Sequence, residues 1–483
     1  MKKLMVSLML IFFVLYASGQ SDLFFHQTQA ETDDLLFGME INDAGDLYIS
    51  GKSFGATGNW LNSWMYRIDE QGQKTDSLVF TDADVSMYQI ECVESNQLLV
   101  FGLREVDGMN YREHVVFRTD ASLNILEEKS FLTDAGDILT GLVRQEEGGA
   151  YVAAITVNTP TYPDVLFMRF SQSGDSLLYH RLNITGTDFV FDVLEKPDAT
   201  GYYAFMASDS IFNNVLYTHE CRVELTADFR PVEFRKLPSG MKGPYSAIRK
   251  NDSLYYLSSR IEENDDLNND LQVGLMDTAQ NLYDQNLFGE FHVDDYPVTR
   301  NAIVSTNEGK LYMAGMYNAS TQFTYPNIFS EVALVKMDEN MNLLWEKTYG
   351  GDAYYETRDM LCDNEQGVAI ALGRYNKDVQ TDEFDIAILR TDAEGDVLFV
   401  RDLFQHNKSV GLYPNPVSQH LNIDLPDDCS PQRIEIVDSR GTVVMHPNPD
   451  QSNMADVSSL PAGYYQIRVA GKNAVYTQSF VKQ

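Results

Sequence analysis

Residues 309–315, GKLYMAG, and residues 331–344, EVALVKMDENMNLL, decide the fold of this chain. The first stretch is a short strand pattern bounded by small residues. The second ends in a basic residue, an apolar residue and Asp338, and a polar loop separates the two stretches. The same unit recurs seven times at intervals of roughly 54 residues, the length of one four-stranded sheet with its turns.

Two series of anchor residues follow this repeat. The first strand pattern of each copy contains a small residue, at Gly51, Gly102, Ala154, Ala207, Ser258, Gly315 and Gly373. The second strand pattern ends at Asp69, Asp120, Ser171, Thr226, Asp277, Asp338 and Asp392. Agreement between two independent series indicates a structural repeat, and the small residues predict close packing between neighbouring sheets.

Each copy reads as four short strands, and long amphipathic helices are absent from the pattern. Four short strands bury too little apolar surface to fold alone, so the sheets must stack. Seven sheets can close into a ring that protects their edges. We therefore predict an all-β fold with a seven-bladed β-propeller over residues 20–404. A strand at Asp22–Gln27 would complete the last blade, and Leu398–Leu403 competes for the same place.

The repeats resemble a known group of sequences. The lines LLWEKTYGGDAYYE (343–356), QGVAIALG (366–373) and DIAILRTDAEGDVL (385–398) are similar to propeller repeats common in surface proteins of the Bacteroidetes. The resemblance implies binding or display at the cell surface and not a chemical reaction.

The amino terminus predicts export. Lys2 and Lys3 precede the apolar run Leu4–Tyr16, which ends in the small residues of 17–19. This pattern is typical of a secretory signal peptide over residues 1–19, and the run is short for a spanning helix. An uncleaved anchor is the alternative. No second apolar run approaches the length needed to span a bilayer, so we expect no membrane-spanning segment in the rest of the chain.

The composition limits the possible partners. The 71 acidic and 36 basic residues give a net charge of −35, which argues against nucleic acid or an anionic membrane. It favours cations, basic partners or a solvated acidic surface. Of the four cysteines, Cys92 and Cys362 occupy the same inner-strand position of copies two and seven, Cys221 lies in the second strand of copy four, and Cys429 lies beyond the repeats. None is an obvious neighbour of another, so we expect free thiols and not disulfides.

The candidate ligand-binding residues fall in loops expected on one face of the propeller, around its channel mouth. The loops between the second and third strands carry the aromatic residues Trp60, Tyr162, Phe323 and Tyr325. Just ahead of the inner strands lies an acidic series, Asp34, Asp84, Asp137, Asp188, Asp295 and Glu356. A ring of carboxylates would suit a cation, an amine or a cationic peptide. The alternative is turn chemistry, because Asp recurs wherever a turn recurs.

Catalytic signatures are missing from the sequence. The eight histidines are scattered, and there is no nucleophile elbow, phosphate loop or paired-cysteine motif. The acidic stretch near Asp266 lacks the glycine that a calcium loop requires, so we expect no metal and no cofactor, apart from a cation at the acidic mouth. We predict a monomeric binding or scaffold protein for glycan or protein. A carbohydrate-active hydrolase or lyase with paired carboxylates at the channel mouth is the alternative.

The repeat ends at Phe404. Residues 405–411 are typical of a linker, and residues 412–483 show alternating strand patterns that predict a small β-sandwich. This segment begins with a short motif, which we call the opening box: Tyr413, Pro414, Asn415 and Pro416. A central turn with Asp438, Arg440 and Gly441 follows, then Leu460, Pro461, Gly463 and Tyr465, with Lys482 near the end.

These boxes are similar, one after another, to the type A sorting domain of the type IX (Por) secretion system. The resemblance implies passage through the periplasm, partnership with the type IX machinery, and a final place outside the cell or on the outer-membrane surface. Members often lose the domain and become attached to surface lipopolysaccharide. An ordinary immunoglobulin-like binding module is the alternative.

Overall fold

A computed structural model describes most of the chain. The described residues are 25–27, 32–55, 60–80, 85–93, 96–106, 112–132, 138–157, 163–182, 188–212, 215–262, 269–289, 293–320, 325–363, 367–377, 384–398, 411–424, 433–438, 443–447, 454–470 and 475–483. The chain divides into two compact units, Met1–Val400 and Arg401–Gln483. The predicted signal peptide and linker lie outside the described residues.

The first unit is a seven-bladed β-propeller, as the repeat predicts. Its first three blades are antiparallel four-stranded sheets. Blade 1 contains β2 (Thr32–Ile41), β3 (Leu47–Gly55), β4 (Trp60–Ile68) and β5 (Lys74–Phe80). Blade 2 contains β6 (Val85–Val93), β7 (Gln97–Glu105), β8 (Arg112–Asp120) and β9 (Ile125–Leu132). Blade 3 contains β10 (Ile138–Gln145), β11 (Tyr151–Val157), β12 (Asp164–Phe170) and β13 (Ser176–Leu182).

The remaining four blades repeat this order. Blade 4 contains β14 (Asp188–Glu195), β15 (Gly201–Phe212), β16 (Val215–Thr226) and β17 (Pro231–Lys236). Blade 5 contains β18 (Met241–Arg249), β19 (Leu254–Glu262), β20 (Asn269–Asp277) and β21 (Leu282–Phe288). Blade 6 contains β22 (Tyr296–Pro297), β23 (Ile303–Ser305), β24 (Leu311–Tyr317), β25 (Glu331–Met337) and β26 (Leu343–Gly350). Blade 7 contains β27 (Tyr354–Asp363), β28 (Gly367–Tyr375), β29 (Asp385–Arg390) and β1 (Phe25–Gln27).

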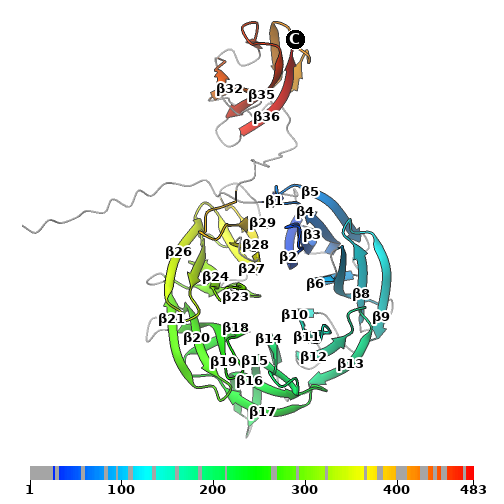
Figure 1. Ribbon diagram of the computed structural model, residues 1–483, viewed down its shortest axis with the longest axis vertical. Coiled ribbons are helices and arrows are strands. Elements are labelled where there is room, and N and C mark those ends of the chain that lie inside the picture. Colours follow the sequence, from blue (N-terminus) through cyan, green and yellow to red (C-terminus); the bar gives the residue numbers. More distant parts are fainter. Residues whose placement is uncertain are drawn as a thin grey trace, which may run out of the picture. The chain divides into compact units, whose positions relative to one another are not determined.

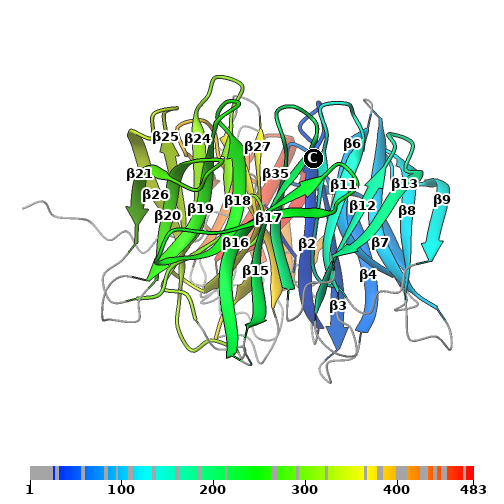
Figure 2. The same ribbon diagram turned by 90° about the horizontal axis from the view of Figure 1, so that it is seen from below.

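The blades surround one axis. The first strand of each blade, such as β2, β6 or β27, lies innermost, and the fourth, such as β5 or β9, lies outermost (Figure 1). The strands run along the ring axis, so loops emerge on two opposite faces (Figure 2). We call the face where the first strands begin the loop face, and the face where they end the turn face.

The amino-terminal strand closes the ring. β1 pairs with β29 as the outermost strand of blade 7, and β2 of blade 1 packs against β27, β28 and β29. The competing run from Leu398 contributes less among the described residues. Val397 forms an isolated bridge with Thr391, and the Leu398 N–H donates to the Arg390 carbonyl at 2.9 Å. The rest of that run lies outside the described residues.

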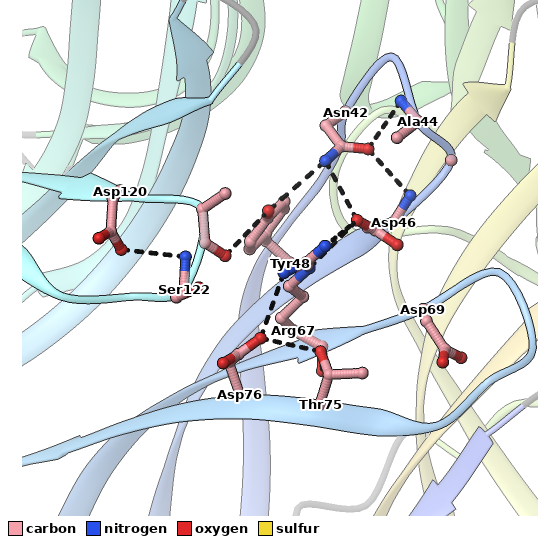
Figure 3. Close-up of polar contacts among 12 residues, drawn as sticks. Asn42, Ala44, Asp46, Tyr48, Arg67, Asp69, Thr75, Asp76, Asp120 and Ser122 are labelled. Atoms are coloured by element: carbon pink, nitrogen blue, oxygen red, sulfur yellow. Dashed lines mark hydrogen bonds and ion pairs between the residues drawn. The ribbon is translucent and has the colours of Figure 1, made fainter.

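A recurring turn accounts for the Asp anchors. In blade 2 the Asp120 carboxylate accepts hydrogen bonds from the N–H group of Ser122 at 3.0 Å (Figure 3) and from that of Asn124 at 2.9 Å. These bonds fix the turn between β8 and β9. The fourth residue of this turn, Leu123, has a positive φ of 63° and a buried side chain. Asp338 caps the corresponding turn of blade 6 in the same way, with Met341 as the buried residue.

Close contact between backbones and side chains explains the small anchor residues. A Cβ on Gly51 would lie 2.3 Å from the Leu35 carbonyl and from the Trp64 ring. A Cβ on Gly315 would lie 2.7 Å from Leu271 of the preceding blade. A larger side chain at Gly315 would push two sheets apart, as predicted from the repeat, whereas one at Gly51 would collide within its own blade.

The second unit consists of two sheets around one core. One sheet contains β30 (Gly411–Tyr413), β31 (His420–Asp424) and β34 (Met454–Asp456). The other contains β33 (Val443–Met445), β32 (Arg433–Asp438), β35 (Gly463–Ala470) and β36 (Val475–Lys482). Residues of both sheets, including Leu421 and Ile467, share one buried cluster, which makes the unit a β-sandwich as predicted.

Two further observations concern the described residues. Cys92, Cys221 and Cys362 are free thiols, as expected, and Cys429 lies outside the described part. Among the residues placed by the structure, no helix has the length and apolar character that crossing a membrane requires.

Candidate functional site

The structure places the acidic series in two kinds of environment. Asp34, Asp188 and Asp295, at the loop-face ends of inner strands, are fully buried. Glu356 is about one-third exposed, with a side-chain exposure of 31%, and its carboxylate pairs with Arg358 at 2.6 Å. Asp84 and Asp137 lie outside the described residues.

The buried members join neighbouring blades. The Asp34 N–H donates to the Phe384 carbonyl of blade 7 at 2.8 Å, and the Asp188 N–H donates to the Pro163 carbonyl of blade 3 at 3.0 Å. The Asp295 N–H likewise donates to the Asn269 carbonyl of blade 5 at 2.7 Å. The backbones of these residues link neighbouring blades, and their buried carboxylates do not form a solvated ring.

Their side chains are held by the adjacent strand of the same blade. Ser53 donates to Asp34 at 2.5 Å, and Ser208 donates to Asp188 at 2.5 Å. Burial raises the pKa of Asp34 to about 7, because the neighbouring Asp385 adds to the desolvation and Ser53 only partly offsets it. The acidic side chain is used within its own blade, where it accepts from a serine hydroxyl at Asp34 and at Asp188.

The structure describes two of the four predicted aromatic residues, Trp60 and Tyr325. Trp60 begins β4, and its backbone pairs with Phe54. Tyr162 and Phe323 lie outside the described residues. Tyr325 lies on the loop face, where its ring centroid is 5.7 Å from that of Phe384 in a stacked arrangement and 5.1 Å from that of Tyr375.

Tyr325 belongs to an aromatic cluster that spans blades 6 and 7 and reaches blade 1. We define this aromatic cluster as Tyr325, Tyr354, Tyr375 and Phe384. The Tyr325 hydroxyl donates to the Asp33 carboxylate of β2 at 2.5 Å. Sequence reasoning identified Tyr325 and missed the other three, which flank strand ends. The signal that could have found two of them is an aromatic residue at the loop-face end of β27, Tyr354, and of β28, Tyr375.

Polar and charged groups surround this cluster. Arg374 forms an ion pair with Asp352 at 3.1 Å, and the Asn376 amide donates to the Asp352 carbonyl at 3.3 Å. The Lys377 ammonium lies 4.6 Å from the centre of the Phe329 ring. The loop face over blade 7 thus combines aromatic rings with hydrogen-bonding groups of both charges.

A second group of charged residues lies near the ring axis. Arg300, between β22 and β23, donates to the carbonyls of Phe37 in blade 1 and Tyr88 in blade 2. It therefore bridges three blades. Burial lowers the pKa of Arg300 to about 10, so the guanidinium remains charged at neutral pH.

Carboxylates accompany Arg300. Asp359 accepts hydrogen bonds from the Asn301 amide at 2.7 Å and the Met360 N–H at 2.9 Å. Burial raises the pKa of Asp359 to about 6, although the nearby Arg300 opposes the shift. Burial also raises the pKa of Glu91 to about 7, against Arg144 and a 3.1 Å hydrogen bond from Gln89.

Glu40 neighbours Glu91. Burial and then the charge of Glu91 raise the pKa of Glu40. Glu40 pairs with Tyr48, while Ile248 and Val304 hold the equivalent register positions in blades 5 and 6. Two acidic side chains thus replace aliphatic ones in adjacent blades. Sequence reasoning missed this pair, although the same comparison between repeat copies could have found it.

No metal site emerges from this arrangement. Within the described ranges, no group of three or more His, Cys, Asp or Glu side chains could hold a metal ion.

In the second unit the opening box contacts the end of the chain. The Asn415 side chain accepts a hydrogen bond from the Val481 N–H at 2.8 Å, and Val417 forms a bridge with Lys482. Tyr413, Pro414 and Pro416 flank Asn415 and are exposed.

The closing box packs within the same sandwich. Leu460 is buried, Gly463 begins β35, and the Tyr465 hydroxyl donates to the Pro461 carbonyl at 2.9 Å. Asp438 pairs with Tyr465, whereas Arg440 and Gly441 lie outside the described residues. The opening box therefore contacts β36, and the closing box leads into β35, which pairs with β32 and β36.

The folds define a β-propeller protein with a carboxy-terminal β-sandwich. Residues 411–483 match the family described as the secretion system C-terminal sorting domain, so this unit is a sorting domain of the type IX secretion system. The protein is accordingly exported to the cell surface or the extracellular space, and the domain implies an interaction with the type IX machinery.

Solved structures resemble the propeller at low sequence identity. A polysaccharide lyase of family PL25, an ulvan lyase, has a TM-score of 0.49 at 7% identity, covering 78% of this chain and 97% of that one. The β-propeller domain of the trilobed protease from Pyrococcus furiosus has a TM-score of 0.44 at 11% identity, covering 77% and 98%. These similarities are too distant to bear on function. No curated protein sequence matches this chain.

Proposed function

We propose that this protein is a surface-exposed binding or scaffold protein that holds a glycan or a protein ligand on the loop face of its propeller. The aromatic cluster carries this proposal. Tyr325, Tyr375 and Phe384 come from different strands and loops, yet their rings lie within 5.1 to 5.7 Å of one another. Tyr325 and Phe384 are partly exposed and can contact a ligand, whereas the buried Tyr375 supports them. Rigid aromatic groups provide contact area at a small entropic cost.

The surroundings of the cluster fit a polar ligand with apolar faces. Sugar rings and amphipathic peptides both combine such faces with hydrogen-bonding groups. Asp33 and Asp352 supply carboxylates, and Arg374 and Lys377 supply cations within the same part of the loop face. A rigid propeller carrying such loops is a common arrangement for recognition.

Binding by the purified mature chain tests the proposal. We would screen it on a glycan array and by pull-down from bacterial surface extracts, then compare Tyr325→Ala and Phe384→Ala. Loss of an anchoring ring is expected to weaken binding by roughly tenfold or more. Phe234→Ala is the matched control, because Phe234 is 49% exposed on the outer strand β17. Equal binding by all three variants would contradict the proposal.

A second candidate function rests on Glu40 and Glu91. Of the carbohydrate-active alternatives, the raised pKa values of two neighbouring carboxyl groups favour a hydrolase, because a glycoside hydrolase needs one carboxyl protonated at neutral pH. Polysaccharide cleavage by the mature chain would be measured from pH 5 to 9, with Glu40→Gln and Glu91→Gln as variants. Activity that persists in both variants would exclude this pair as the catalytic site.

A further inference from the structure

We propose that a cavity between blades 1 and 2 on the turn face binds a single neutral or amino-sugar ring, independently of the loop-face ligand. The cavity has a volume of about 140 Å³. Its lining includes Asn42, Asp43, Tyr48, Cys92, Gln97 and Leu98, which come from the ends of β2 and β6 and the starts of β3 and β7.

The position of the cavity separates it from the aromatic cluster. β2 begins near Asp34 on the loop face and ends at Ile41, where the cavity lies. The two sites therefore occupy opposite faces of the propeller. A substitution in one is expected to leave the other unchanged.

The size fits the ring of one sugar. A cavity of about 150 Å³ holds a molecule as large as benzene, so this volume accommodates one six-membered ring, while the hydroxyl groups of the sugar extend to the polar rim. Longer glycans could enter only through a terminal residue.

The lining offers hydrogen-bonding groups that the fold does not saturate. The Asn42 oxygen caps its turn by accepting from the N–H groups of Ala44 at 3.0 Å and Asp46 at 2.9 Å. The Asn42 amide nitrogen has only long contacts, 3.4 Å to Asp46 and 3.5 Å to the Tyr48 hydroxyl (Figure 3). A good N–H···O bond measures about 2.9 Å, so this donor retains capacity for a ligand hydroxyl.

The remaining walls complete a sugar-like environment. Gln97 adds an amide and Asp43 adds a carboxylate at the rim, while Leu98 is buried and supplies an apolar wall. The Tyr48 ring is buried, and its hydroxyl donates to the Ala121 carbonyl of blade 2 at 3.2 Å, which holds the ring in place. Polar side chains outnumber apolar ones in this lining, which suits a hydroxylated ligand more than a hydrocarbon.

Charge restricts the kind of sugar. Burial, and then the charges of Glu40, Glu91 and Asp43, raise the pKa of the Cys92 thiol. The Asp43 carboxylate on the lining opposes a uronate or a sulfated sugar and favours a neutral or protonated amino sugar. The thiol stays protonated at neutral pH, so the site binds without covalent chemistry.

Saturation-transfer NMR with the mature chain tests this proposal. The probes are methyl glucoside, methyl galactoside, N-acetylglucosamine, glucosamine and glucuronic acid. At least one neutral or amino sugar is expected to bind, and glucuronic acid is expected not to bind.

Three variants locate the site. Asn42→Thr removes the amide donor but keeps a turn cap, since Thr306 caps the equivalent turn of blade 6 by accepting from the Lys310 N–H at 3.1 Å. We expect at least a fivefold loss of affinity. Gln97→Trp fills the cavity and should abolish binding. Asn251→Thr is the matched control, because Asn251 caps the corresponding turn of blade 5 by accepting from the Ser253 N–H at 2.9 Å.

Each outcome bears on the proposal. No transfer to any neutral or amino sugar overturns it, and so does binding that survives Gln97→Trp. Melting temperatures of the variants show whether a loss of binding reflects unfolding. Tyr325→Ala should leave the sugar affinity unchanged, which distinguishes failure of this site from failure of the loop-face site.

Discussion

The backbone of Phe25 pairs with that of Ile388 in antiparallel register, although more than three hundred residues separate them in the sequence. Through this pairing β1 completes blade 7 and closes the propeller. A mature chain lacking residues 20–27 should lose roughly 2–4 kcal/mol of stability, because three residue pairs of the ladder disappear. Thermal unfolding measures the loss, and amide exchange at Ile386–Ile388 should accelerate.

The control for this deletion is His26→Ala, which leaves the backbone pairing intact. A deletion variant as stable as the parent would show that another segment closes blade 7.

A substitution at Phe229 tests how much the buried residue of the recurring turn contributes to stability. This residue has a positive φ of 62° in the turn after β16, and its buried ring packs against Phe167 with a centroid distance of 5.3 Å. Phe229→Ala should destabilise the propeller by about 3–5 kcal/mol, the usual loss for a buried aromatic side chain. Denaturant unfolding gives the value. Phe234→Ala, on an exposed outer strand, should change stability by only about 0.5 kcal/mol.

The raised pKa of Asp34 predicts that the stability of the propeller depends on pH. Its folded pKa of about 7 lies above its ordinary value of 3.8, so the folded state binds more protons between these values. The contribution of Asp34 to stability therefore falls as pH rises from about 4 to 7 and stays low above that window. Asp34→Asn should remove this slope and raise stability at pH 8, since an uncharged amide can still accept from Ser53.

The measurement is urea unfolding at pH 5 and pH 8. Asp188→Asn serves for comparison, because Asp188 also accepts a hydrogen bond from a serine at 2.5 Å. An unchanged pH slope in Asp34→Asn would mean that this carboxyl is not a source of the dependence.

The sorting domain predicts the route of the protein. Deleting residues 411–483 should leave the propeller in the periplasm, because the chain then lacks the domain that addresses it to the type IX machinery. Cell fractionation and surface proteolysis measure the location. A fusion of residues 405–483 to a periplasmic reporter should reach the surface, and undiminished display of the truncated chain would refute the assignment.

The repeat made the strands and their order predictable. The anchor Asp120 ends β8 and the anchor Asp338 follows β25. Both cap turns, because an Asp carboxylate accepts from amides two and four residues ahead. Gly315 marks a close contact between blades. The turn caps depend on local geometry, and the small residues recur because each copy packs in the same way. Both features are therefore visible in the sequence of each copy.

The candidate site was less predictable for a physical reason. Arg300 contacts the carbonyls of Phe37 and Tyr88, more than two hundred residues away, only because ring closure brings blades 1, 2 and 6 to one axis. The aromatic cluster forms in the same way, since Tyr325 and Asp33 meet across the closing point of the ring. Periodicity within a copy contains no information about such contacts.

The sequence by itself determined seven four-stranded repeats, their turns and the sorting domain, because strand periodicity, turn residues and short boxes act over a few neighbouring positions. Only the tertiary structure decided that Asp34, Asp188 and Asp295 are buried between blades, and that Glu40 and Glu91 meet near the axis. Burial and proximity across blades depend on how the sheets pack around the ring, which no single repeat specifies.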